Sequence, residues 1–320
     1  MKIFNKSKLT SLRYYFQDLP LWACGVRSQS LIERLSNFLQ ADTPQLLRGL
    51  DLLKKYADMS QKNYRSEDLA DRALWVKIIR ESDAYTSLRM SRKNIDAYFR
   101  IEGIEHLHRV LKKGRPVFLL TGHIGSFFIP AIAFGHMGIP VFPIARTVDP
   151  SNILPFERQL YEKINYLFSG LRFPSQYIFT SYPGTIDRKI ISRCISGGIF
   201  WAALDLPRAY YSYKRIPVKF LGFPSSLPSG LIKLGIKYNA VLLTAWNMIE
   251  PDPSAGYIRH LRIDEPFPER LNISEVLQIY ADRLSSLIAA EPWQWAGLPI
   301  IHEFIEERQT SGNPVYHAKA

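Results

Sequence analysis

The stretch KKGRPVFLLTGHIGSFFIP, residues 112–130, decides the fold. Residues 117–121 form a short apolar run that is typical of a buried strand, and the loop 122–125, Gly-His-Ile-Gly, follows it. A helix capped by Ser126 is expected next. Because ligands in open α/β sheets gather at the carboxyl ends of strands, the pattern places His123 where chemistry is usually done.

Short apolar runs alternate with amphipathic segments from about residue 100 onward. This alternation predicts an α/β fold with a central, mostly parallel sheet flanked by helices. Further strands are predicted at residues 141–145, 199–204 and 241–246. Helices are predicted at residues 127–136, 154–168, 186–195, 227–237 and 274–290.

The chain is predicted to form one α/β domain, residues 101–307, with additions at both ends. Residues 1–100 predict a helical extension packed on that domain, and residues 308–320 predict a flexible tail. The extension has apolar residues at helical spacing, among them Leu69, Ala73, Val76 and Ile79. No Gly/Ser-rich linker divides the sequence.

The composition is that of a globular protein with a strong basic excess: 47% of its 320 residues are hydrophobic and the formal net charge is +12. Such a charge attracts phosphate-rich lipid surfaces, nucleic acids or acidic carrier proteins. No nucleic-acid-binding motif accompanies it, so a nucleic-acid partner is not expected. The sequence also lacks a recognisable signal peptide or spanning segment, which predicts peripheral attachment to any membrane.

The cysteines and histidines do not follow a metal-binding pattern. Cys24 and Cys194 are far apart, which predicts two reduced thiols and no disulfide framework. His106 and His108 are expected on the surface of a helix, and no dinucleotide or phosphate-loop fingerprint occurs. The sequence therefore predicts no metal and no bound cofactor.

His123 has two interpretations from the residues alone. A lone histidine commonly caps a helix or satisfies a buried hydrogen bond. The flanking Gly122 and Gly125 favour a functional site instead, because glycine lets the backbone approach a ligand closely.

Five stretches resemble the bacterial lipid A late acyltransferases, the lauroyl and myristoyl transferases of the lysophospholipid-acyltransferase-like superfamily. They span residues 101–127, with the His123 loop, and then 142–150, 199–208, 218–246 and 291–298, the last reading EPWQWAGL. The resemblance covers residues 100 to 300 in conserved order. It implies an acyltransferase that takes an acyl group from carrier protein or coenzyme A and acts at the cytoplasmic face of the bacterial inner membrane, as in lipid A biosynthesis.

One position departs from the family's motif, a histidine followed five positions later by an acid. The chain supplies His123 but has Phe128 in place of the acid. Losing an orienting acid costs about 10⁴ in turnover in serine proteases. Three outcomes stay open: a slower enzyme, a substitute carboxylate or an inactive protein. Asp205 is the best substitute, since it follows a predicted strand and falls on the acidic residue of the family's second block, although it can equally cap a loop.

The resemblance implies further substrate-binding residues. Arg146 and Arg208 follow predicted strands and suit the phosphate of an acceptor lipid or carrier arm, although each can be a plain surface arginine. Gly222 falls in a glycine-containing substrate-binding block. Gly122, Gly125 and Phe128 complete the predicted set, in which amides of the Gly122 to Gly125 loop, or Arg146, would stabilise an oxyanion.

The predicted function is transfer of a fatty acyl group from a thioester to a hydroxyl or amine of a glycolipid or related acceptor, with His123 as the base and Asp205 as its partner. The expected partners are acyl carrier protein or acyl-coenzyme A, a lipid or glycolipid acceptor and a membrane surface; the sequence does not predict an oligomeric state. The alternative is a catalytically inactive, acyltransferase-like scaffold that binds lipid or acyl carrier, with a cytoplasmic location also open.

Overall fold

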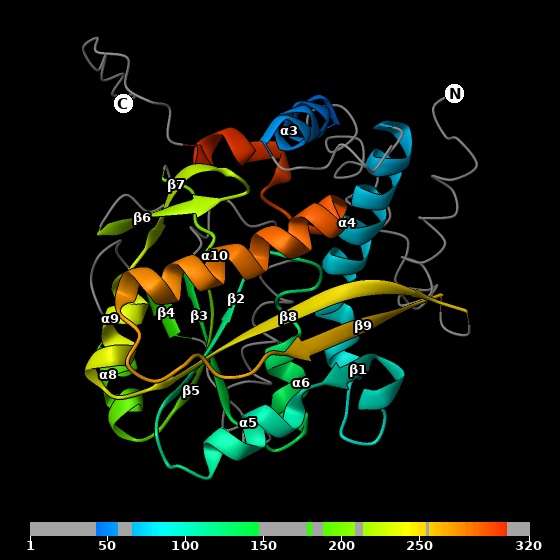
Figure 1. Cartoon of the computed structure of the whole chain (residues 1–320). Coiled ribbons are helices and arrows are strands. Elements are labelled where there is room, and N and C mark those ends of the chain that lie inside the picture. The colour runs from blue at the N-terminus through cyan, green and yellow to red at the C-terminus, as the bar shows by residue number, and fades with distance from the viewer. Residues whose placement is uncertain are drawn as a thin grey trace, which may run out of the picture.

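A seven-stranded sheet lies at the centre of the protein (Figure 1). The computed structural model describes residues 43–56, 66–146, 178–180, 188–208, 214–253 and 256–305. The strands of the sheet are β1 (Phe99–Glu102), β2 (Val117–Thr121), β3 (Val141–Arg146), β4 (Ile178–Thr180), β5 (Ile199–Ala203), β8 (Val241–Asp252) and β9 (Gly256–Ile263). A separate hairpin consists of β6 (Arg215–Phe220) and β7 (Phe223–Pro228).

The strand order in the seven-stranded sheet is β1-β9-β8-β2-β5-β3-β4. Its described pairings are parallel except for that of β8 with β9, which is antiparallel. The helices are α3 (Thr43–Tyr56), α4 (Ser66–Arg89), α5 (Ile104–Leu111), α6 (Pro130–His136), α8 (Arg188–Ile195), α9 (Gly230–Lys237) and α10 (Ile273–Ala290). Short 3₁₀ helices are η3 (Ile95–Ala97), η5 (Pro292–Gln294) and η6 (Leu298–Phe304). The predicted α/β class with a mostly parallel sheet and flanking helices is confirmed.

Alternate residues of the central strands face two different helical layers. In β2, Phe118 and Leu120 join the core that α4, α8, α9 and α10 share. Val117 and Leu119 join a second core with α5 and α6 on the opposite face. Because successive side chains of a strand point to opposite faces, a strand buried on both sides reads as the continuous apolar run seen in the sequence.

The described N-terminal helices pack into the same core as the sheet. Leu69, Ala73, Val76 and Ile79, one face of α4, are all buried in it, which confirms the helical periodicity predicted for this segment. Helix α3 lies against η6 and contributes Leu46, Leu50 and Leu53. Helix α4 also contacts the loop after β2, where Ser126 donates to Asp83.

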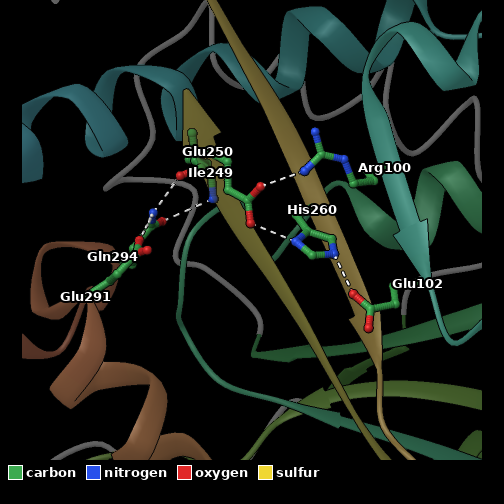
Figure 2. Close-up of polar contacts among 7 residues, drawn as sticks. All are labelled: Arg100, Glu102, Ile249, Glu250, His260, Glu291 and Gln294. Carbon is green, nitrogen blue, oxygen red and sulfur yellow. Dashed lines mark hydrogen bonds and ion pairs between the residues drawn. The ribbon is translucent and has the colours of Figure 1, made fainter. Parts of the chain in front are cut away.

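Strands β1, β9 and β8 are joined at their surface by a polar cluster (Figure 2). The ring of His260 on β9 lies between Glu250 on β8, 2.7 Å from Nδ1, and Glu102 on β1, 3.0 Å from Nε2. Arg100 donates to Glu250 over 3.0 Å. These groups are partly exposed, so the cluster links the three strands but adds little to stability.

A buried ion pair fixes α4 against β9. Arg259 donates through Nε and Nη2 to Oδ1 of Asp83, at 3.0 and 2.7 Å, and both side chains are buried. Burial raises the pKa of Asp83 to about 6, against the opposing effect of the Arg259 charge. Ser126 Oγ, from the loop after His123, donates to the same carboxylate oxygen over 3.3 Å. The pair therefore links α4, the sheet and that loop.

Replacing Arg259 with Met is expected to lower the free energy of unfolding by about 3–5 kcal/mol, because it leaves the Asp83 carboxyl buried without its partner. Replacing both residues, as Asp83→Leu with Arg259→Met, is expected to cost less than the single change, since an apolar pair leaves no buried charge. Denaturant unfolding measures both values. A single variant as stable as wild type, or a double variant less stable than the single, would contradict this reading.

Several element boundaries differ from those predicted. The helix predicted at 127–136 begins at Pro130, and Ser126 is not its cap: the N-cap is Ile129, and no side chain caps the helix. The helix predicted at 227–237 begins at Gly230, because residues 227–228 complete the hairpin strand β7. Strands β1, β4, β6, β7 and β9 were not predicted, and the helix predicted at 154–168 lies outside the described residues.

No helix in the described ranges combines the length and apolar character that crossing a membrane requires. This finding does not test the peripheral membrane location that the sequence predicts.

Candidate functional site

The pairing of β2 with β5 brings His123 and Asp205 together. Thr121 lies opposite Ala203 in the parallel register, and Leu204 N donates to Thr121 O as the strands end. His123 and Asp205 each come two residues after this matched pair, so they meet at the carboxyl edge of the sheet. His123 Nδ1 lies 2.8 Å from Asp205 Oδ1, which confirms the predicted proximity.

The Asp205 carboxylate is buried and held by groups from two segments. The backbone N–H of His123 donates to both of its oxygens, at 3.0 and 2.9 Å. Trp295, which follows η5, donates its indole N–H to Oδ2 over 2.8 Å. These bonds fix the plane of the carboxylate and aim Oδ1 at the imidazole.

The contact with Asp205 sets the tautomer and the pKa of His123. An ionised carboxylate only accepts hydrogen bonds, so Nδ1 carries the proton and Nε2 of the neutral ring keeps a free lone pair. Burial lowers the pKa of His123, but the charge and hydrogen bonds of Asp205 outweigh it and raise the pKa above the ordinary value of 6.5. Such an imidazole can accept a proton at Nε2 and hold it as a stabilised cation.

The loop 122–126 is anchored to β8 and η5 by its backbone. Gly125 N donates to Gln294 O over 2.8 Å, and Ser126 N donates to Asn247 O over 3.1 Å. Gly125 has φ of 53°, and a Cβ there would lie 2.1 Å from Asn247 O, so only glycine fits. The amides of His123, Gly125 and Ser126 are thus committed inside the protein. The expectation that this loop's amides form an oxyanion hole does not hold for them.

Gln294 completes this anchoring through its side chain (Figure 2). Its Nε2 donates to Ile249 O over 2.6 Å and its Oε1 accepts from Ile249 N over 3.2 Å. The side chain is fully buried, and Glu291 accepts a further bond from its Nε2. Gln294 therefore ties the segment that carries Trp295 to β8, just as its carbonyl ties the His123 loop.

Helix α10 closes the site from the side of the core. Tyr280 donates its hydroxyl to Thr121 O over 2.7 Å. Burial and the nearby Asp205 charge raise the pKa of Tyr280 well above its usual value, so the phenol stays protonated. A Cβ at Gly122 would lie 3.0 Å from the methyl groups of Leu284 and 3.4 Å from Asp205 Oδ2. Gly122 thus lets α10 pack close to the dyad.

The outward side of His123 lies next to an aromatic ring and a cation. The His123 side chain is 31% exposed, and among the described residues no hydrogen-bond partner of Nε2 is found. The Phe127 ring meets it edge to face at a centroid distance of 4.7 Å. The Arg80 guanidinium, from α4, lies 5.8 Å from the Phe127 ring centroid. Nε2, the ring nitrogen that can act as a base, therefore faces away from Asp205, and the Phe127 ring lies beside the imidazole.

The other predicted site residues lie at varied positions. Phe128 is partly buried and packs against the α5–α6 core, while the acid that contacts His123 is Asp205. Arg208 is exposed in the turn after Asp205. Gly222, with φ of 87°, is in the two-residue turn between β6 and β7. Arg146 ends β3, and its side chain lies outside the described part.

Sequence reasoning missed Trp295 and Arg80. Trp295 lies in the EPWQWAGL stretch, but nothing local marks it as the partner of an acid 90 residues earlier. Arg80 is one of many basic residues of the N-terminal helices, and only the packing of α4 places it near His123. Both residues come close to the His123–Asp205 pair only through tertiary contacts, which no local sequence pattern shows.

Among the described residues, neither a group of metal ligands nor a pocket provides a second candidate functional site to compare with the His123–Asp205 pair. Within the described ranges, no group of three His, Cys, Asp or Glu side chains could hold a metal ion, and Cys194 is a free, buried thiol, whereas Cys24 lies outside the description. An open pocket of about 460 Å³ lies elsewhere, between β9 and α10. Its lining is Arg262, Asp264, Glu265, Arg283, Ser286 and Leu287, none of which contacts the dyad.

No family model matches the chain, and no curated protein matches it.

Proposed function

We propose that the protein is an acyltransferase that uses the His123–Asp205 dyad to activate an acceptor hydroxyl or amine. The observation that carries the proposal is the 2.8 Å contact between His123 Nδ1 and Asp205 at the carboxyl edge of a parallel sheet. It supplies the carboxylate whose place in the family's motif is taken by Phe128. The resemblance of residues 100 to 300 to lipid A late acyltransferases selects acyl transfer among the reactions open to such a pair.

In the proposed reaction, His123 Nε2 takes the proton of the acceptor as its oxygen or nitrogen attacks the thioester carbonyl. The carbonyl electron pair moves onto oxygen to give a tetrahedral intermediate. Its collapse breaks the C–S bond, and the imidazolium returns the proton to the departing thiolate. Asp205 orients the ring and stabilises the imidazolium during this sequence.

The proposed co-substrates follow from the same resemblance and from charge. The donor is a fatty acyl thioester on carrier protein or coenzyme A, and the acceptor is a glycolipid or a related lipid. The net charge of +12 favours an acidic carrier protein, a phosphorylated donor or an anionic membrane surface over neutral partners. Peripheral binding at the cytoplasmic face of the inner membrane is part of the proposal.

The proposal is tested by incubating the purified protein with dodecanoyl-coenzyme A or a dodecanoyl carrier protein and a hydroxylated glycolipid. Acylated acceptor is detected by mass spectrometry, and free thiol is measured in parallel. Transfer to the acceptor supports the enzyme. Tight binding of either thioester with no thiol release from any donor would instead favour the non-catalytic scaffold.

Replacing Phe128 with Glu in the same assay distinguishes a site in which Asp205 serves as the acid from one that has lost its acid at position 128. We expect no gain, or a loss of severalfold, because the new carboxylate would enter an apolar cluster while Asp205 already holds Nδ1. Phe128→Leu, which keeps the apolar contact, is the matched control and should stay near wild type. A large gain in turnover with Glu would mean that Asp205 does not serve as the acid.

A further inference from the structure

A permanent positive charge near His123 has no role in the dyad itself. The Arg80 guanidinium lies over the Phe127 ring, which in turn touches the imidazole. Its charge lowers the pKa of His123, opposing Asp205. A base that becomes cationic during the reaction is disfavoured by a second cation nearby. Asp83 already offsets part of the Arg80 charge, and a negative charge that forms close to both His123 and Arg80 would offset the rest.

The proposed reaction creates such a negative charge on the thioester carbonyl oxygen. Stabilising it requires hydrogen-bond donors or cations that are already oriented. The amides of His123, Gly125 and Ser126 donate to Asp205, Gln294 and Asn247. These three amides are therefore not available to an oxyanion, and a cation beside the base can stabilise it instead.

Arg80 is held in position by the helix that carries it. Asp83 lies one turn further along α4 and so on the same face. It binds Arg259 on β9 and accepts from Ser126 of the His123 loop. This part of α4 is thus fixed to both the sheet and the loop, which limits the reorientation that Arg80 needs to meet a developing charge.

We propose that Arg80 is a catalytic residue that stabilises the oxyanion formed beside His123 during acyl transfer. The inference rests on the proposed function and adds to it the source of oxyanion stabilisation. As the acceptor attacks, the carbonyl electron pair moves to oxygen next to the guanidinium while the acceptor's proton moves to His123 Nε2. The guanidinium keeps its proton throughout and acts through hydrogen bonds and charge.

The test compares Arg80→Met and Arg80→Lys with Arg72→Met. Arg72, two turns earlier on α4, also stacks on an aromatic ring, with its guanidinium carbon 4.5 Å from the Trp293 centroid, so its variant controls for loss of such a contact. We expect Arg80→Met to lower kcat about 10²–10³-fold with KM little changed, as for loss of one oxyanion donor. Arg80→Lys should fall between Met and wild type, and Arg72→Met should keep wild-type kcat.

A second readout does not need turnover. The titration of the His123 ring, followed by NMR and assigned with a His123 variant, should shift to higher pH in Arg80→Met because a repelling charge is lost. An unchanged midpoint, an unchanged kcat, or an effect on KM alone would each overturn the role of Arg80. If the wild-type protein transfers no acyl group, the proposed function fails together with the role of Arg80. If wild type and the Arg80 variants are equally active while His123 variants are inactive, only the role of Arg80 is refuted.

Discussion

Replacing Asp205 with Asn is expected to lower kcat by about 10⁴, the loss found when the orienting acid of a serine-protease triad is disabled. The geometry explains why an isosteric change would be so costly. Trp295 donates to one carboxylate oxygen, so the amide oxygen of Asn is expected to take that position and its NH₂ to face His123 Nδ1. An NH₂ group cannot accept from Nδ1–H, and the ring is driven to the tautomer with the proton on Nε2.

The pH profile and a double variant distinguish the change of the His123 tautomer from general damage to the fold. In wild type, the rate should fall as the pH drops through the raised pKa of His123, above 6.5, because the protonated ring cannot act as a base. Asp205→Asn should move that midpoint down. Adding Trp295→Phe removes the competing donor, lets the amide turn its oxygen to Nδ1 and should recover part of the activity.

The matched control for this change is Asp282→Asn on the exposed face of α10, which should keep wild-type turnover. Asp205→Asn with near-normal kcat and an unshifted pH profile would mean that the carboxylate is only structural.

The central strands could be predicted from the sequence because they are buried on both faces. Residues 117–121 were predicted to the residue, since a parallel strand covered on both sides is a continuous apolar run. Strands β6 and β7 lie outside the main sheet and include prolines, and β9 alternates buried and half-buried residues. These strands pair with neighbours in sequence, β6 with β7 and β8 with β9, but prolines in β6 and β7 and the charged Arg259 among the buried positions of β9 hide the apolar pattern of a strand.

The candidate site could be predicted in part. His123 and Asp205 each follow a strand that the apolar pattern predicts. Neighbouring parallel strands end at the same edge of a sheet, so the sequence predicts that the two residues lie close together. The matched register of Thr121 and Ala203 then decides that the two side chains meet. The roles of Trp295 and Gln294 could not be predicted, because a 3₁₀ segment from the end of the chain has to dock beside β8 first.

The most direct test of the central claim is acyl transfer by His123→Ala beside wild type. Without the imidazole, no group is left to take the acceptor's proton, and transfer should fall below detection, by at least about 10⁴-fold. His108→Ala, on the exposed side of α5, is the control and should be fully active. Thermal unfolding of the three proteins establishes that the site variant is folded. The account predicts acylated acceptor from wild type and the control and none from His123→Ala; undiminished transfer by His123→Ala would contradict it.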